Sequence, residues 1–302
     1  MMQKIQKYKI EYNAEIKSNK PGIKLWIVEP TSNDYQKISN FFISSKINSK
    51  YIYSNNKINY LNFPKNKYIR IKFSFDIENQ FFNKKIDINK IETISKSSNI
   101  FKQYTKQIKF LEQTPKIKKI AKYLSKDQKN PYNIAKNIFL YIINNFEYRY
   151  PVKKRGVKNL NLKKLKGDCG EYSALFATLC RINKIPAKIN TGFVVFSKKI
   201  KEHAWNSIYL KPYGWLDIDT QYGSLEKEKA IEKYFCKTIE NRIVFVTDYN
   251  IEIKPSIPKD YNTDYLKKIY LPINKNNAQV LQPLVFATKN KTIYFKEKIR
   301  LK

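Results

Sequence analysis

Long stretches in the first third of the chain alternate apolar and polar residues. Segments 8–17 and 68–77 place an apolar side chain at every second position, and residues 23–28 form a short apolar run. Alternation with a period of two is typical of a strand with one buried face. The inward positions are Tyr8, Ile10, Tyr12, Ala14, Ile16, Ile69, Ile71, Phe73, Phe75 and Ile77. We therefore predict an antiparallel β-sandwich domain over residues 1–110.

The apolar spacing then becomes helical. Residues 114–124 carry apolar side chains three and four positions apart, and segment 129–146 predicts a second helix that Asn130 caps and Pro131 opens. A third helix is expected to start near Gly170, followed by a series of strands. We predict an α+β fold in which residues 111–250 form a core of helices packed on an antiparallel sheet. Residues 251–302 are expected to form a C-terminal extension that packs on this core.

Charge and composition limit the class of protein. The chain of 302 residues is 42% hydrophobic, which fits a folded protein, and its formal net charge is +34. Such a charge attracts anionic polymers, but the lysines are spread evenly and no nucleic-acid-binding motif accompanies them. We expect weak binding to anionic polymers and no specific nucleic-acid recognition. With three cysteines, no long apolar run and no leader-like N-terminus, we also expect no membrane span and a cytoplasmic location.

Residues suited to chemistry gather in one region. Six of the seven glycines and the single histidine lie between residues 156 and 223. Within this region Cys169 lies between Asp168 and Gly170, at the start of the third helical pattern. The free N–H groups and dipole of a helix N-terminus lower the pKa of a thiol there. We interpret Cys169 as a nucleophile with a lowered pKa, and Cys180, on the apolar face of the helix, as buried and inert.

Acyl transfer from a thiol needs a base, and His203 is the only imidazole in the chain. It enters a strand on which His203, Trp205, Ser207 and Tyr209 share a face. Residues 211–214 predict a hairpin turn, after which Asp217 and Asp219 point to the same face as His203 if the loop holds three or five residues. Asp219 lies farther from the turn, so we predict that it orients His203 and that Asp217 does not.

Three segments together resemble the conserved blocks of the transglutaminase-like superfamily, which has a papain-like cysteine fold. They are GDCGEYSALFATLCRINKIPAKINTGF from residue 167, EHAWNSIYL from residue 202 and YGWLDIDTQYG from residue 213. The resemblance makes Cys169 the nucleophile, His203 the base and Asp219 its orienting residue. The N-terminal β domain also looks like the extra domain that precedes this core in many bacterial and archaeal members.

The chain departs from the family pattern at three places. Asn183-Lys184 stands where a glycine is usual, Asn206-Ser207 replaces an acidic-apolar pair, and Thr220-Gln221 replaces Pro-Thr. None of these changes removes an atom from the triad. They concern substrate contacts.

The resemblance implies a thioester reaction. Cys169 attacks an amide carbonyl, its backbone N–H and further donors hold the oxyanion, and His203 protonates the leaving amine. Tyr148, Gly170 and Trp205 are candidates for oxyanion or substrate contacts, and no cofactor or metal is expected.

Water as acceptor gives hydrolysis and an amine gives cross-linking. We predict a Cys-His-Asp amide hydrolase or acyltransferase acting on a peptide or protein, with hydrolysis favoured. A true amine-accepting transglutaminase is one alternative. The other is a non-catalytic protein that binds an anionic partner through the basic loop 153–166, although a scaffold has no physical need for three such exacting residues.

Overall fold

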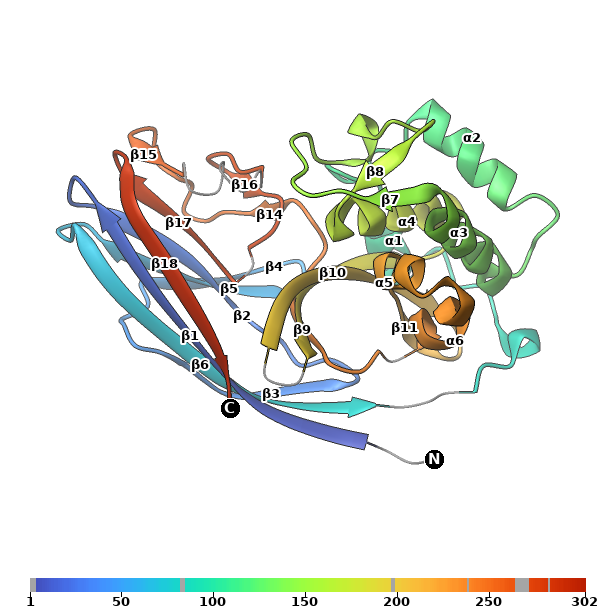
Figure 1. The fold of residues 1–302 in the computed structure, drawn as a ribbon, viewed down its shortest axis with the longest axis horizontal. Coiled ribbons are helices and arrows are strands. Elements are labelled where there is room, and N and C mark those ends of the chain that lie inside the picture. Colours follow the sequence, from blue (N-terminus) through green and yellow to red (C-terminus); the bar gives the residue numbers. More distant parts are fainter. Residues whose placement is uncertain (1–3, 82–84, 197–198, 238, 264–271, 282) are drawn as a thin grey trace. The chain divides into compact units, whose positions relative to one another are not determined.

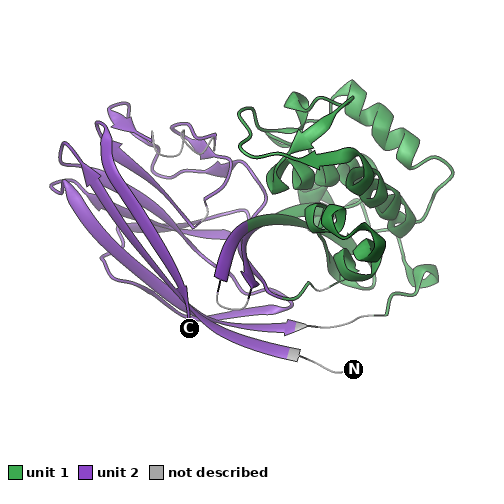
Figure 2. Ribbon diagram, in the orientation of Figure 1, with its two compact units in different colours: residues 1, 82–190, 203–240 green, residues 2–81, 191–202, 241–302 purple. Residues whose placement is uncertain are grey.

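The computed structural model describes residues 4–81, 85–196, 199–237, 239–263, 272–281 and 283–302, and its fold is α+β. The chain divides into two compact units, each assembled from separate parts of the sequence (Figure 2). The helical unit comprises residues 82–190 and 203–240. The β unit comprises residues 2–81, 191–202 and 241–302.

Two antiparallel sheets form the β unit. The first has the strand order β18 (Thr292–Leu301), β1 (Lys4–Ser18), β6 (Tyr68–Phe81) and β3 (Gln36–Ile43). The second has the order β15 (Tyr261–Asn262), β17 (Leu284–Lys289), β2 (Ile23–Glu29), β5 (Asn56–Phe63) and β4 (Ser49–Tyr53). A small pair consists of β14 (Ile251–Glu252) and β16 (Asn277–Ala278).

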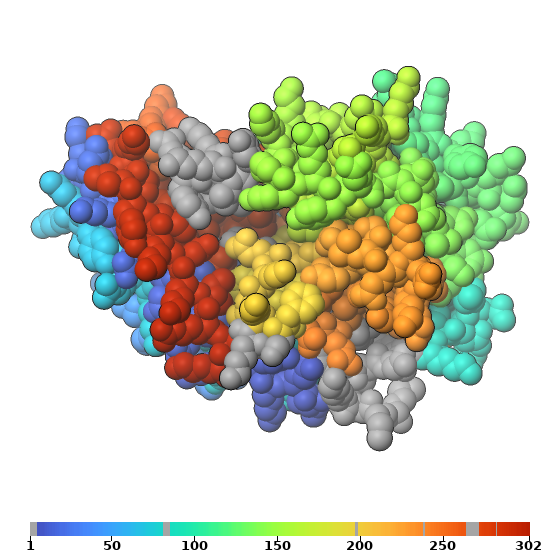
Figure 3. Space-filling view, viewed as in Figure 1, coloured from blue at the N-terminus to red at the C-terminus, as the bar shows by residue number. Residues whose placement is uncertain are grey.

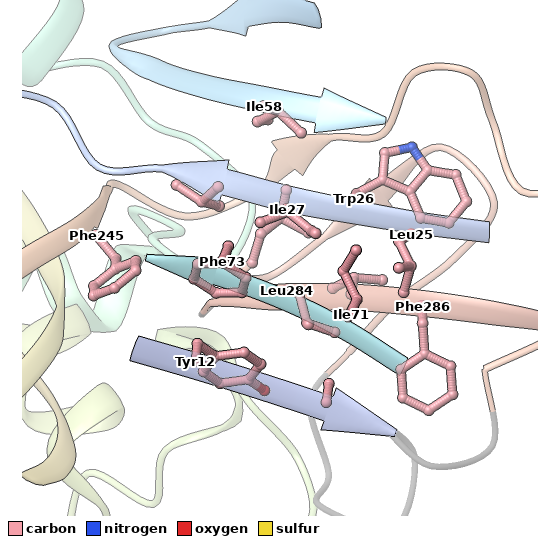
Figure 4. Packing of buried hydrophobic residues seen from close by; sticks show 14 of the residues in the cluster. Tyr12, Leu25, Trp26, Ile27, Ile58, Ile71, Phe73, Phe245, Leu284 and Phe286 are labelled. Atoms are coloured by element: carbon pink, nitrogen blue, oxygen red, sulfur yellow. The ribbon is translucent and has the colours of Figure 1, made fainter. Parts of the chain in front are cut away.

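One hydrophobic core joins the two sheets (Figure 4). The inward positions predicted from the alternation are buried, except Tyr8, which is partly buried. Tyr12 stacks on Phe73 of the neighbouring strand at 4.6 Å between ring centroids. Phe286 of β17 and Phe295 of β18 stack across the two sheets at 4.8 Å. The short run in β2 is buried on both faces, and its Trp26 Nε1–H donates to the Lys254 carbonyl. The predicted sandwich is therefore present.

The composition of the sandwich differs from the expected boundaries. Strands β17 and β18 come from the last twenty residues of the chain, and they pair with β2 and β1 (Figure 1). Residues 251–302 thus belong to the β unit and supply strands to both of its sheets, whereas the sequence predicted an extension on the core. Residues 82–110, expected in the β domain, belong to the helical unit.

The helical unit contains the predicted helices. Its helices are α1 (Asn99–Tyr104), α2 (Pro115–Leu124), α3 (Pro131–Asn145), α4 (Cys169–Ile182), α5 (Thr220–Leu225) and α6 (Ala230–Tyr234), with 3-10 turns at Ile88–Lys90, Val157–Asn159 and Lys227–Lys229. Asn130 caps α3 as expected, because its Oδ1 accepts a hydrogen bond from the Tyr132 backbone N–H. Apolar residues of α2, α3 and α4 fill the interior.

Strands position the ends of these helices. Short parallel strands β7 (Phe146–Tyr148) and β8 (Leu165–Gly167) lead out of α3 and into α4. A further sheet has the order β12 (Phe235–Lys237), β11 (Gly214–Ile218), β10 (Lys199–Leu210), β9 (Ala187–Phe196) and β13 (Arg242–Thr247). Strands β9 and β10 run from one unit into the other, and the helical unit contains the start of β9 and the end of β10.

Candidate active site

The hairpin of β10 and β11 brings His203 and Asp219 together. Ser207 pairs with Asp217 and Leu210 with Gly214, so the loop holds three residues and positions of equal parity share a face. His203 Nε2–H donates to Asp219 Oδ2 at 2.7 Å. The two residues are 5% and 0% exposed, so water does not compete for this bond. Because a carboxylate only accepts, the bond fixes the proton of the neutral ring on Nε2.

Asp219 is itself held by the start of helix α5. Its Oδ1 accepts the Tyr222 backbone N–H at 3.0 Å, which makes Asp219 the N-cap of α5. The imidazole ring of His203 lies parallel to Trp205 at 6.0 Å and edge-on to Tyr222 at 4.9 Å. The carboxylate and the two aromatic rings therefore hold the imidazole in one orientation.

Asp217 has a different environment. Its Oδ1 accepts from Ser207 Oγ at 2.6 Å, and Ser207 Oγ accepts in turn from Asn190 Nδ2 at 2.7 Å. This chain of hydrogen bonds runs from β11 through β10 to β9. His203 thus pairs with Asp219 while Asp217 stabilises the sheet, as strand parity and distance from the turn predicted.

Cys169 is the first residue of α4, and its N-cap is Asp168. The Asp168 carboxylate accepts the Gly170 backbone N–H at 2.9 Å, and the backbone N–H of Ala204, next to His203, lies near enough to the Cys169 thiol to lower its pKa. Helix α4 thus presents its first residue to the strand that carries the imidazole. Cys169 is partly exposed, whereas Cys180, at the far end of the helix, is fully buried.

The thiol environment reverses one expectation. Burial raises the pKa of Cys169, the Asp168 carboxylate raises it further, and the Ala204 N–H and Arg155 only partly oppose them. The helix N-terminus was expected to lower this pKa, but loss of water and the adjacent negative charge outweigh it. Burial raises the pKa of Cys180 as well. The two thiols therefore differ in access to solvent, and Cys169 keeps its proton at rest.

A buried ion cluster surrounds the start of α4, and the sequence analysis missed it. The Arg155 guanidinium contacts Asp168 Oδ1 and Oδ2 at 2.7 Å each and Glu171 Oε2 at 2.6 Å. All three side chains are buried. The loop that carries Arg155 lies at the surface of the helical unit, yellow-green in Figure 3, and was considered in the sequence analysis only as a basic loop for an anionic partner. The available signal was the residue type, because only six of the 59 basic residues are arginine.

The two carboxyl groups of the cluster differ in protonation. Burial alone would raise the pKa of Asp168, but the hydrogen bonds and charge of Arg155 reverse this and hold it below its usual value. Burial raises the pKa of Glu171 to about 8, with a further contribution from the Asp168 charge and an opposing one from Arg155. Near neutral pH, the cluster is therefore an arginine–aspartate ion pair with a mostly protonated glutamic acid.

Tyr148 lies at the open side of the same region. It pairs with Gly167 across the parallel strands β7 and β8, and it is 49% exposed. Burial raises the pKa of Tyr148, and the nearby Cys169 adds to this shift. Tyr148 and Cys169 are therefore neighbours. Gly167, the strand partner of Tyr148, allows the close approach of β8 to α4, because a Cβ there would lie 2.6 Å from the Cβ of Glu171.

The other two residues expected at the oxyanion or substrate occupy different places. The Gly170 N–H donates to Asp168, so the helix cap holds it. Trp205 is fully buried and stacks on the imidazole of His203, so its side chain is not exposed for contact with a substrate. Within the described ranges, no group of three or more His, Cys, Asp or Glu side chains is arranged to hold a metal ion. None of the helices in the described part of the chain has the length and apolar character needed to cross a bilayer.

Comparison with known proteins supports the resemblance to the transglutaminase-like superfamily. The sequence model of the transglutaminase-like superfamily matches residues 118–220, which include Cys169, His203 and Asp219. A candidate cysteine protease from Cytophaga hutchinsonii has a similar structure, with a TM-score of 0.61, 15% identity, and coverage of 99% of this chain and 93% of that one. A search among curated proteins finds no match.

A second similar structure is more distant. The periplasmic domain of TgpA from Pseudomonas aeruginosa aligns with a TM-score of 0.42 and 14% identity, over 71% of this chain and 74% of that one. At these identities the structural likeness concerns the fold. The family match and the shared fold together support a cysteine-type enzyme in general.

Proposed function

We propose that this chain, whose core over residues 118–220 belongs to the transglutaminase-like superfamily, cleaves or transfers the acyl group of a peptide or protein amide through a Cys169 thioester. The observation that carries the proposal is the buried hydrogen bond of 2.7 Å between His203 and Asp219, next to the strand position that contacts the Cys169 thiol. An oriented imidazole beside a cysteine at a helix start is the arrangement that acyl transfer requires.

The bond to Asp219 uses Nε2 of His203, which leaves Nδ1 to take the thiol proton. Because the resting thiol is protonated, His203 removes this proton as Cys169 Sγ attacks the amide carbonyl. Asp219 stabilises the imidazolium that forms. The imidazolium then donates the proton to the leaving amine, the C–N bond breaks, and a thioester remains on Cys169. An acceptor that loses its proton to His203 attacks the thioester and releases the thiol.

The carbonyl oxygen becomes negatively charged during both steps. The Cys169 backbone N–H is one of the donors at the start of α4 that have no acceptor within the helix. We assign the Tyr148 hydroxyl as the second donor, since it neighbours Cys169 from β7 and is exposed enough to meet a substrate. Two such donors would hold the oxyanion more strongly than the starting carbonyl.

Water is the acceptor that we favour. Although burial raises the pKa of its thiol, Cys169 remains partly exposed and Tyr148 is about half exposed, so a water molecule has a path to the thioester without a second binding site. Amine acceptance, as in a true transglutaminase, is the alternative outcome for the same intermediate. A protein or peptide substrate fits either outcome.

The first test is to trap the acyl-enzyme. The protein is incubated with p-nitrophenyl acetate, and release of nitrophenol and the mass of the acylated peptide are followed. We expect a label on Cys169, no label in Cys169→Ala, and a normal label in Cys180→Ala, the matched control on the same helix.

The second test separates the two acceptors. A casein digest with and without a biotinylated primary amine distinguishes new peptide ends from amine incorporation. Cleavage that depends on Cys169 supports hydrolysis, and amine incorporation at the expense of cleavage supports transglutamination. Full activity in Cys169→Ala would overturn the proposal.

A further inference from the structure

The buried cluster of Arg155, Asp168 and Glu171 surrounds the nucleophile and has no part in the steps derived above. Asp168 precedes Cys169 directly and Glu171 follows it by two residues, so two carboxyl groups flank the thiol along the chain. Arg155 reaches both from the loop that precedes β8. The Glu171 Oε1 also accepts the Gly156 backbone N–H at 3.3 Å, which ties the same loop to the helix a second time.

We propose that Arg155 is a positioning residue for the nucleophile. By pairing with Asp168 and Glu171, it fixes the first turn of α4 and offsets negative charge that opposes formation of the Cys169 thiolate. This inference rests on the proposed role of Cys169, and it assigns the thiol's reactivity to a residue fourteen positions away in a surface loop.

Geometry separates this role from ordinary packing. The guanidinium contacts Asp168 with two parallel donors, Nη1 to Oδ1 and Nη2 to Oδ2, and the same Nη1 donates to Glu171 Oε2. A planar fork that satisfies two carboxyl groups at once is a property of arginine that lysine lacks. Because Asp168 also caps α4 through the Gly170 N–H, movement of Arg155 would disturb the turn that presents Cys169.

Charge provides the second part of the argument. Burial is the largest cause of the raised pKa of the Cys169 thiol, the Asp168 carboxylate raises this pKa further, and Arg155 lowers it by a smaller amount. The other ionisable groups near the thiol are Tyr148 from β7, His203 from β10 and Asp219 at the start of α5. Asp219 also raises the pKa of the thiol although it is paired with His203, and Arg155 is the cation that opposes the negative charge from the helix side.

A second buried arginine serves as a matched control. Arg181 lies near the opposite end of α4 and is fully buried. Its Nε donates to the Ala187 carbonyl oxygen and its Nη1 donates to the Lys106 carbonyl oxygen. Arg181 is therefore buried, as Arg155 is, and lies on the helix that carries Asp168's neighbour Cys169, but these two acceptors are uncharged backbone carbonyl groups. Loss of Arg181 should weaken the fold without changing the charge at Cys169.

The experiment measures the rate of Cys169 alkylation by iodoacetamide against pH in the full chain. Variants are Arg155→Met, Arg155→Lys, Glu171→Gln and Arg181→Met, each checked by thermal unfolding to be folded at the assay temperature. Below the thiol pKa, the rate reports the thiolate fraction whether or not a substrate is known, so this readout is independent of the proposed enzymatic activity.

Loss of the cation should make Cys169 of Arg155→Met react roughly tenfold more slowly at a given pH, a shift of about one pH unit. Arg155→Lys should fall between this variant and the wild type. Glu171→Gln should match the wild type near pH 7 and react faster above pH 8, where the wild-type glutamate ionises. Arg181→Met should follow the wild-type profile.

Two results would overturn the inference. One is a wild-type alkylation profile in folded Arg155→Met, and the other is an equal shift in Arg181→Met, which would make the effect a general loss of stability. If Arg155→Met does not fold, Glu171→Gln decides the question, because an unchanged profile above pH 8 contradicts the charge argument. Failure of the proposed function would appear elsewhere, as activity that survives Cys169→Ala.

Discussion

The two sides of the candidate site hold their polar groups in different ways. On the strand side, His203 is enclosed by aromatic rings and makes one short bond to one carboxylate. On the helix side, Cys169 starts a helix next to a buried arginine and two carboxyl groups. In the proposed mechanism, the base would thus be controlled by its orientation and the thiol by the balance of charge around it. A substitution on the strand side should change turnover, whereas one on the helix side should change the pH dependence.

The largest effect is expected on the strand side. Asp219→Asn keeps the shape of the side chain but loses the charge that stabilises the imidazolium, so turnover should fall on the order of 10²- to 10⁴-fold. Asp217→Asn, the matched control two residues away, should cost far less, because Asp217 accepts from Ser207. Steady-state hydrolysis of p-nitrophenyl acetate measures both. Equal losses in the two variants would mean that orientation of His203 is not what limits turnover.

Tyr148→Phe should have the next largest effect. Removal of an oxyanion donor costs about 10²-fold or more in kcat in known enzymes, and we expect a loss at the lower end here because Tyr148 is 49% exposed. Tyr150→Phe, a neighbouring tyrosine that is 59% exposed, is the control and should leave kcat unchanged. The comparison of kcat with KM for a peptide substrate distinguishes the donor from a binding contact. A change in KM alone would remove Tyr148 from the oxyanion site.

The same contrast explains what the sequence could reveal. The His203–Asp219 pair follows from local rules, since strand alternation and a three-residue loop fix which side chains share a face. Arg155 follows from no such rule. It lies in an irregular segment, so no periodicity predicts its direction, and the seven basic residues of loop 153–166 suggested a surface for an anionic partner. The raised pKa of Cys169 was also missed in the sequence analysis. This shift depends mainly on burial of the thiol away from water, which only the folded structure shows.

The β unit shows a similar limit. Alternation in β1 and β6 predicted the buried apolar side chains apart from Tyr8, which is partly buried, but it did not predict that Glu11 and Ser74 on the outward face are buried as well. It could not predict the partners of β17 and β18, because a strand pattern near the end of the chain is compatible with any free sheet edge. Only the pairing of β18 with β1 and of β17 with β2 shows that the last residues complete the sandwich.

A smaller effect is expected on stability as a function of pH. The folded-state pKa of Glu171 is raised to about 8, so the folded protein holds this proton while the unfolded chain releases it near pH 4.5. The protonated group therefore favours folding at low pH, and this contribution declines as pH rises from about 4.5 to about 8. Glu171→Gln should lack this decline, and its stability relative to wild type should increase by about 1 kcal/mol or more over this range. Thermal unfolding at pH 5, 6.5 and 8 tests this, and parallel curves for the two proteins would contradict it.

The smallest effect on the thiol is expected from the exposed cations of the same loop. Lys153 and Lys154 directly precede Arg155 in the chain, but both are exposed, so water and salt screen their charge. The double variant Lys153→Gln/Lys154→Gln should therefore alkylate at Cys169 within about twofold of the wild-type rate at every pH, since exposed charges contribute little. Heparin binding, measured at low and physiological salt, should weaken in the variant and nearly vanish in both proteins at the higher salt. A shift in alkylation as large as that expected for Arg155→Met would show that the thiol responds to the charge of the whole loop. The buried ion pair would then have no special role, and the difference between the two sides of the site would be reduced to one of net charge.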